Sequence, residues 1–294
     1  MTATIVAQQA INGIVLGSLY VLVALGLTLI YGVLVQINFA HADFVTLGAF
    51  AAYFVMHALG GQYLLGIVAA LLVGAALGWA INITVFAPLR RKGNELLPLI
   101  ATIGVSVMLQ NAMLAWFGPV PYAFETPYSQ KVFRVAGTFF TLQSVIIIAV
   151  SATTIALLYA FMKFTFLGKA LRAVAQDRET AGLMGINPNT LIMLTIVISS
   201  ALAGMGGAML APVLVLTPFA GASVIVKAFA IVIIGGFGNV EGTILAGLLV
   251  GLIESFTTQY LDPGLIDIVV FGLLLLMLAF RPTGLISERR EENV

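Results

Sequence analysis

The sequence predicts an all-α fold, a polytopic bundle of membrane-spanning helices, and two observations support this. Hydrophobic residues make up 61% of the 294 residues and charged residues only 9%, whereas soluble domains average about half apolar and about a quarter charged residues. The few charges gather in short stretches between long apolar runs, and the mean hydropathy is +1.12. Lipid is therefore expected to cover most of the surface. We expect residues 1–294 to form a single transmembrane domain.

Five apolar runs are long enough to cross the hydrocarbon core, which takes about 20 residues of helix. They cover residues 11–35, 63–86, 96–117, 139–161 and 191–210. Four further runs are shorter or interrupted, and each could be a tilted span, a half-helix or a re-entrant segment. These cover residues 44–59, 224–234, 242–256 and 265–280. The sequence therefore predicts about eight or nine spans, including interrupted helices.

Basic residues are distributed unevenly between the connections. Ten of the 13 fall in three stretches: Arg90, Arg91 and Lys92; Lys163, Lys169, Arg172 and Arg178; Arg281, Arg289 and Arg290. The connection 118–137 contains only Lys131 and Arg134. Because short loops rich in Lys and Arg stay in the cytoplasm, we expect the three basic stretches inside and residues 118–137 outside. Nine spans with an external N-terminus satisfy this pattern, but so do eight spans with one re-entrant segment.

The first ten residues contain no Lys or Arg, so they lack the basic region of a signal peptide. We expect the first apolar run to stay in the protein as a helix.

Three pairs of glycines are spaced four residues apart within apolar runs: Gly13 and Gly17, Gly74 and Gly78, Gly247 and Gly251. This spacing puts both glycines on one helical face and lets two backbones approach closely in lipid. Contacts within one bundle are the expected role. A seam between two subunits is the alternative.

Several function classes lack the residues they need. The chain has no cysteine and two histidines, which leaves little for a structural metal site or a disulfide framework. No Walker A motif occurs, and Gly236-x-Gly238 lacks the third glycine and the strand-turn-helix setting of a dinucleotide site. Basic residues occur in small separate groups, without the basic and aromatic groove that nucleic acid requires. We expect no cofactor, no metal and no nucleic acid.

Polar residues interrupt apolar sequence at residues 37–44 and 235–242. Phe39 precedes Asp43 with the same spacing as Phe237 precedes Glu241, which suggests a weak internal repeat. Transporters built from repeats place their substrate pathway at such interrupted helices. The candidate pathway residues are Asn38, His41, Asp43, Gly236, Asn239 and Glu241. The alternative is that both acids only cap helices at an interface, and their depth in the membrane decides between the two interpretations.

Two charged residues, Lys227 and Glu254, fall within apolar runs. A lone charge at the centre of a span costs about 2.5 to 3.5 kcal/mol on insertion scales. We expect both side chains to snorkel to the outer interface. His57 is expected at an interfacial helix end.

The longest basic connection, residues 163–189, is predicted to be a cytoplasmic loop that contains one helix from Ala170 to Gly185, with Pro188 beyond its end. Its small residues fall near one stripe, so the helix could dock in a groove of a partner protein. The candidate contact residues are Arg172, Ala175, Asp177, Ala181 and Gly185. A membrane-surface helix without a partner is the alternative.

Four ordered motifs resemble one family. They are Gly26-Leu-Thr-Leu-Ile-Tyr-Gly-Val with Ile37-Asn-Phe-Ala-His-Ala-Asp, Gly168-Lys-Ala-Leu-Arg-Ala-Val-Ala-Gln-Asp with Gly185-Ile-Asn, Lys227-Ala-Phe-Ala with Gly235-Gly-Phe-Gly-Asn, and Arg281-Pro-Thr-Gly-Leu-Ile. Together they resemble the permeases of branched-chain amino acid ABC importers, most closely the H-type subunit of the leucine/isoleucine/valine system. The resemblance covers nearly the whole chain.

The resemblance implies a permease subunit in the inner membrane that translocates branched-chain amino acids and is not itself an enzyme. It also implies a second related permease subunit, two ABC ATPase subunits and an external substrate-binding protein. Closure of the ATPases would then push on the helix from Ala170 to Gly185, and rigid packing would convert this into alternating access.

The sequence departs from the family at both interruptions. The family usually has Asn-Phe-Ala-His-Gly-Glu where this chain has Ala42 and Asp43, and commonly has a serine and a proline-glycine within the stretch 239–242. Urea, short amides or other amino acids therefore remain alternative cargoes. A stand-alone secondary transporter or channel would carry paired charges within the membrane, and an integral-membrane enzyme would need clustered His, Asp or Glu.

Overall fold

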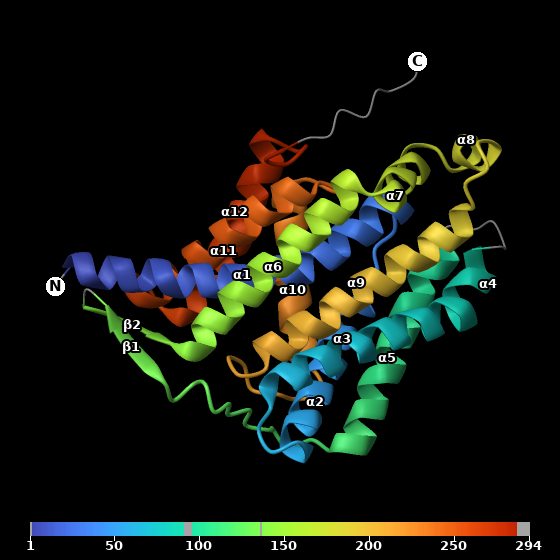
Figure 1. Cartoon of the computed structure of the whole chain (residues 1–294). Helices are drawn as coiled ribbons and strands as arrows, with labels where there is room; N and C mark the ends of the chain where they lie inside the picture. The colour runs from blue at the N-terminus through green and yellow to red at the C-terminus, as the bar shows by residue number, and fades with distance from the viewer. Residues whose placement is uncertain (1, 91–95, 136, 287–294) are drawn as a thin grey trace.

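The computed structural model describes residues 2–90, 96–135 and 137–286, and its described part is almost entirely helical (Figure 1). The long helices are α1 (Thr2–Leu34), α2 (His41–Ala58), α3 (Tyr63–Ile81), α5 (Leu96–Phe117), α6 (Leu142–Phe164), α9 (Pro188–Leu210), α10 (Ala220–Gly235), α11 (Val240–Tyr260) and α12 (Ile266–Phe280). The shorter helices are α4 (Ala87–Arg90), α7 (Phe166–Gln176) and α8 (Arg178–Leu183), with a π-helical turn at Asn82–Phe86 and a 3-10 turn at Pro263–Leu265. The prediction of an all-α bundle is confirmed.

Seven helices of the described residues are long and apolar enough to cross a membrane: Ala3–Leu34, Tyr63–Arg90, Leu96–Phe117, Leu142–Phe164, Pro188–Leu210, Val240–Tyr260 and Pro263–Phe280. The second of these continues from α3 through the π turn into α4. The apolar helix α10 is shorter, and α2 is long enough but less apolar than these seven. With α10 and α2 included, nine helices of the described residues correspond to the nine apolar runs of the sequence, although only seven meet both the length and the hydropathy expected of a span.

The two ends of the bundle differ in composition. Helices α4, α7 and α8, which carry the basic residues Arg90, Lys169 and Arg178, lie at one end, here called the basic end (Figure 1). The N-terminus and a β-hairpin lie at the other, here called the hairpin end. The Gln8 side chain donates to the Phe139 carbonyl over 2.8 Å, so α1 begins at the hairpin end. This arrangement matches nine spans with the N-terminus on the side opposite the basic loops.

The hairpin consists of β1 (Val132–Val135) and β2 (Thr138–Thr141), which pair antiparallel with Val132 opposite Thr141. The expected span 139–161 is therefore wrong at its start, because its first three residues belong to β2. Thr141 ends the strand and caps α6 by accepting a hydrogen bond from the Ser144 amide at 3.1 Å. A threonine at this position satisfies an amide that the helix itself cannot.

The paired glycines hold helices of this chain together. A Cβ atom on Gly251 would lie 2.3 Å from the Gly17 nitrogen, and one on Gly13 would lie 2.7 Å from the Cα of Leu252. In the same way Gly74 faces the Ser200 carbonyl of α9. Both sets are contacts within the bundle, as expected, and they explain why α1 packs along α11 and α3 along α9.

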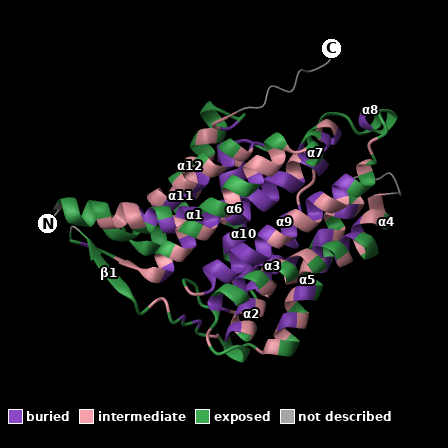
Figure 2. Ribbon diagram, viewed as in Figure 1, coloured by how far each residue is buried: buried purple, intermediate pink, exposed green. Residues whose placement is uncertain are grey.

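Burial is graded from the centre of the bundle outwards (Figure 2). In the most apolar stretch of α1, 89% of the residues are buried. In the corresponding stretches that contain α6 and α12, 17% and 6% of the residues are buried. Apolar side chains on α6 and α12 therefore face outwards, where lipid or another membrane subunit covers them.

Candidate functional site

The first interruption, residues 35–40, turns back into the bundle. Helix α1 ends at Leu34, and Val35 has the unusual φ of 55° for a residue other than glycine. The fully buried His41, first residue of α2, lies with its Nε2 atom 3.1 Å from the Val23 carbonyl oxygen. Val23 lies about three helical turns before Leu34. Helix α2 therefore begins deep inside the bundle, beside the middle of α1.

Asp43 lies in the first turn of α2 and is only 2% exposed. The polar side chains beside its carboxyl group are Ser106 and Gln110 of α5. Among residues 2–90, 96–135 and 137–286, neither its buried Oδ2 atom nor the buried Nδ1 atom of His41 has a hydrogen-bond partner. In native proteins such buried, unpaired polar atoms are rare and each one needs a physical explanation.

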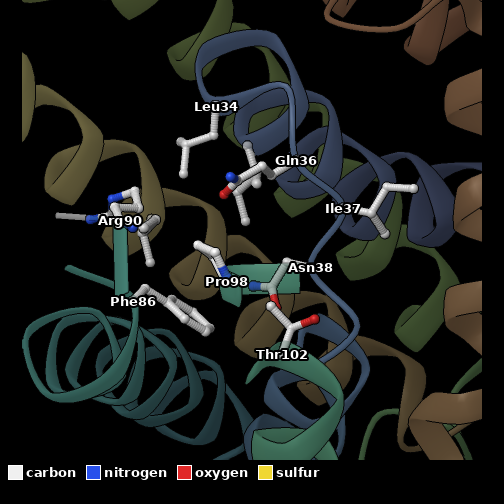
Figure 3. Close-up of a pocket in the computed structure, with 10 residues that line it drawn as sticks. Leu34, Gln36, Ile37, Asn38, Phe86, Arg90, Pro98 and Thr102 are labelled. Carbon is white, nitrogen blue, oxygen red and sulfur yellow. The ribbon is translucent and has the colours of Figure 1, made fainter. Parts of the chain in front are cut away.

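An open cavity lies beside the first interruption, with about 280 Å³ of empty space that includes its solvent-facing mouth (Figure 3). Its polar lining residues are Gln36, Asn38, Arg90 and Thr102, and its apolar lining residues are Ile30, Leu34, Ile37, Phe86, Pro98 and Ile196. Asn38 is buried, and its side-chain oxygen accepts from the Ala40 amide at 3.1 Å. The Arg90 guanidinium donates to the Asn82 side chain at 2.7 Å. The cavity combines apolar walls with a few polar groups, as small-molecule sites do.

A second open cavity lies near the start of α10 and has mostly apolar walls, with about 260 Å³ of empty space that includes its mouth. It is lined by Val45, Thr46 and Ala49 of α2, by Gly207, Leu210 and Ala211 at the end of α9, by Leu214, Val215 and Leu216, and by Ala220, Gly221 and Val224 of α10. The Gly221 amide donates to the Thr46 hydroxyl at 2.9 Å. The first turn of α10 is therefore joined to the start of α2 inside the bundle.

The second interruption, residues 236–239, is a capped turn. Gly236 and Gly238 have φ values of 104° and 79°, which favour glycine. Asn239 caps α11 by accepting from the Gly242 amide at 2.7 Å. Glu241 is exposed and accepts from the Tyr159 hydroxyl at 3.2 Å. These are the contacts of a helix start at the basic end.

Aromatic side chains connect the two interruptions reciprocally. Tyr31 of α1 stacks on Phe237 with ring centroids 4.1 Å apart, and Phe229 of α10 packs against Phe39 at 5.9 Å. Tyr31 stands eight residues before Phe39, and Phe229 stands eight residues before Phe237. Each interruption thus contacts the helix that precedes the other, at equivalent positions of the suspected repeat.

The charges in α10 and α11 pair with each other. The Lys227 ammonium lies 2.7 Å from Glu254, and the Tyr20 hydroxyl of α1 donates to the same carboxylate at 2.8 Å. The two charged side chains are only 16% and 10% exposed. The expectation that both snorkel to the outer interface is wrong, because each charge compensates the other inside the bundle. His57, by contrast, is exposed in the last turn of α2, as expected.

The basic loop 163–189 forms two helices instead of the single helix expected from Ala170 to Gly185. Asp177 is extended and separates α7 from α8. Its side chain caps α8 by accepting from the Glu179 and Thr180 amides at 2.8 and 3.1 Å. The bond from the Thr180 hydroxyl and the amide bonds lower the pKa of Asp177. An aspartate is a better helix start than a helix interior residue, which explains the break.

The small-residue stripe of this loop faces inwards. Ala181 is buried, Ala175 is half-buried, and the exposed Arg172 donates to the Met162 carbonyl. Gly185 has a φ of 83° and follows α8, where the chain turns towards α9. The loop therefore packs this stripe against its own bundle.

Two large apolar side chains at the tip of the loop, Leu183 and Met184, are 88% and 79% exposed. Exposed apolar side chains that lie together make this tip a candidate contact for a partner protein. Sequence reasoning missed them, although two large apolar residues directly before Gly185 in a polar loop were a usable signal.

Arg178 connects the loop to the first interruption, and this was also missed. Its guanidinium donates to the carbonyls of Val33 and Leu34 at 3.1 and 2.9 Å. These carbonyls end α1 and have no partner within the helix. Arg91, Lys92, Arg289 and Arg290 lie outside the described residues.

Comparison with known proteins gives consistent matches along the chain. Residues 9–278 match the family model of the permease component of branched-chain amino acid transport systems. The chain is 35% identical to the high-affinity branched-chain amino acid transport permease BraD of Pseudomonas aeruginosa and 34% identical to LivH of Salmonella typhimurium, each over 98% of this chain and 97% of the relative. It is 25% identical to LivM of Escherichia coli, over 98% of this chain and 72% of that protein. No solved structure matches the chain.

Proposed function

The chain belongs to the family of permease components of branched-chain amino acid transport systems, and we propose that it carries branched-chain amino acids across the membrane as one subunit of an ATP-driven importer. It is a multi-pass inner membrane protein. The observation that carries the proposal is the full-length similarity to BraD and LivH, whose names state this cargo. The mostly apolar walls of both cavities fit the apolar side chains of such amino acids.

The proposed importer has further subunits. Two ABC ATPase subunits supply the energy, because this chain has no Walker A motif. A second permease chain completes the pathway, and the similarity to LivM supports a related but distinct chain in that position. An external substrate-binding protein delivers the amino acid at the hairpin end.

We propose that the tip of α8 is the contact with the ATPases. Leu183 and Met184 are exposed apolar side chains of the size that fills a groove in a partner. Asp177 fixes the start of α8 through its three hydrogen bonds, and Ala181 anchors α8 to the bundle. Of the residues predicted from sequence, Ala175 and Ala181 face the bundle beneath this tip, whereas Arg172, Asp177 and Gly185 are exposed on the same loop.

Movement of α8 has a direct route to the pathway. Arg178 binds the last carbonyls of α1, and residues 35–40 follow immediately. A shift of α8 would therefore displace the end of α1 and the segment that carries Asn38. Because packed helices shift between discrete arrangements, this movement can switch the pathway between two openings.

The proposed pathway passes the first interruption, with Asn38, His41 and Asp43. Irregular backbone and buried polar side chains at depth are tolerated where they line a pathway. A pathway role for Gly236, Asn239 and Glu241 stays a prediction, and their contacts are those of a turn and a helix cap.

The test is uptake by the reconstituted importer in proteoliposomes with ATP inside. We expect uptake of labelled leucine that unlabelled isoleucine and valine suppress and urea does not. Suppression by urea and not by the amino acids would overturn the proposed cargo. Uptake by this chain without ATPase subunits would overturn the proposed energy source.

A second experiment tests the contact with the ATPases. Leu183→Asp places a charge in the proposed apolar contact, so we expect the ATPases to be lost on purification or ATP hydrolysis to proceed without uptake. Leu183→Met keeps an apolar side chain and is the control. Normal uptake by Leu183→Asp would remove the tip of α8 from the coupling mechanism.

A further inference from the structure

Asp43 is a deeply buried acid, and no basic residue in the described part of the chain forms an ion pair with it. It is 2% exposed, and its Oδ2 atom has no hydrogen-bond partner. The ion pair between Lys227 and Glu254 is the single salt bridge found among the described residues. A buried carboxylate is costly unless a cation or several hydrogen bonds compensate it. Lys227 compensates the charge of Glu254. Among the described residues, the Oδ2 atom of Asp43 has no cation and no hydrogen-bond donor beside it.

The side chains around Asp43 are polar and come from α5. Ser106 and Gln110 face the carboxyl group, and the Gln110 amide donates to the Ser106 hydroxyl at 3.1 Å. Both residues are half-buried, so this edge of α5 is only partly covered by the chain. Polar side chains on a spanning helix face a water-filled path or another protein segment and not lipid. Met108, which is 57% exposed, marks another side of the same helix.

We propose that Asp43, with Ser106 and Gln110, forms the subsite that accepts the ammonium group of the amino acid as it passes through the permease. This inference rests on the proposed function. The ammonium group has three donors and a positive charge, so it can satisfy the open Oδ2 atom and compensate the carboxylate at once. The apolar side chain of the cargo needs only apolar walls. The start of α2 deep in the bundle puts the acid where a midway site is expected.

Uptake by acid variants is the first test, in the complete importer. Asp43→Asn keeps size and hydrogen bonding but removes the charge, so we expect leucine uptake to fall about tenfold or more. Asp43→Glu keeps the charge and should retain a large part of the uptake. Asp262→Asn is the matched control, since Asp262 is an exposed cap outside the bundle that accepts from the Gly264 amide.

The second test measures the charge of the site directly and does not depend on uptake. The chain contains no cysteine, so Ser106→Cys and Met108→Cys each introduce one thiol, in an importer whose other subunits are also free of cysteine. We expect Ser106→Cys to react faster with a cationic than with an anionic methanethiosulfonate reagent, and saturating leucine to protect it. Adding Asp43→Asn should remove the preference for the cation. Met108→Cys should show no protection by leucine.

The outcomes separate this inference from the proposed function. If the unaltered importer takes up leucine and Asp43→Asn does so equally well, the ammonium subsite is wrong and the function stands. A charge preference at Ser106→Cys that Asp43→Asn leaves unchanged overturns it as well. If the unaltered importer takes up no branched-chain amino acid, the proposed function itself fails, whatever the labelling of Ser106→Cys.

Discussion

The two interruptions are alike in sequence and opposite in structure. Each has a phenylalanine four residues before an acid, and the two phenylalanines make reciprocal aromatic contacts. Asp43 is buried with an open oxygen, beside a segment that turns back into the bundle. Glu241 is exposed, bonded to Tyr159, and follows a capped glycine turn. The same motif thus marks a candidate binding position at depth and a helix start at the surface.

The depth of an acid, and not its motif, decides its role. An acid in the first turn of a helix always gains from the helix dipole. Only the deep one also lacks solvent, so only there does an unpaired carboxylate call for a ligand. The following experiments test this difference.

The largest expected effect contrasts the two acids. Asp43→Asn should reduce leucine uptake about tenfold or more, whereas Glu241→Gln, which removes an exposed charge, should change it by less than about twofold. Initial uptake rates in proteoliposomes measure both. Equal effects would mean that depth does not separate the two interruptions.

The next effect concerns the link between the loop and the first interruption. Arg178→Ala leaves the Val33 and Leu34 carbonyls without their donor, so we expect the uptake per ATP hydrolysed to fall several-fold. Each hydrogen bond to a charged group contributes about 1.5 to 3 kcal/mol. Parallel measurement of uptake and phosphate release checks this, with Lys169→Ala as the control for loss of a positive charge in the same loop. A ratio unchanged in Arg178→Ala would show that the two regions are not linked through this side chain.

The aromatic contacts allow a test of the repeat itself. Phe39→Leu and Phe237→Leu each remove one reciprocal contact, and such pairs contribute about 0.5 to 1.5 kcal/mol beyond area burial. We expect losses of similar size in thermal stability in detergent. A double-mutant cycle with Tyr31→Leu should show coupling to Phe237 and additivity with Phe39. Coupling to both would contradict the reciprocal arrangement.

The smallest effect is expected at the second interruption. Asn239→Ala removes the cap of α11 and should cost about 1 kcal/mol of stability, while Asn239→Asp should cost less because aspartate caps equally well. Thermal unfolding in detergent measures the loss, and uptake at low temperature should remain close to normal. Lost uptake with unchanged stability would instead give Asn239 the pathway role predicted from sequence.

Parts of the site were predictable because their signals are local. The pattern of apolar runs predicted the helices, and the glycine spacing predicted close contacts within the bundle, which the structure shows between α1 and α11. Polar residues within apolar sequence marked Asn38, His41 and Asp43 as unusual. The single helix predicted for residues 170–185 was wrong because helix propensity was weighed above the capping preference of Asp177.

Other features required partners that are distant in the chain. In the sequence, Lys227 and Glu254 are isolated charges in separate apolar runs. No neighbouring residue indicates that they form an ion pair beside Tyr20. Arg178 was counted only among the basic residues of the loop. The carbonyls that it binds lie about 145 residues earlier in the chain, so the sequence around it does not indicate them. Leu183 and Met184 stand out only once Ala181 is seen to be the residue of α8 that is buried, which leaves these two large apolar side chains outside.

Composition, apolar length and motif are properties of neighbouring residues. They were therefore enough to predict the membrane class, the approximate number of helices, the family and the positions of both interruptions. The depth of each interruption, the pairing of the charges and the exposed side of the loop came from the folded structure alone. These depend on which helices meet, and that choice follows from packing over the whole bundle.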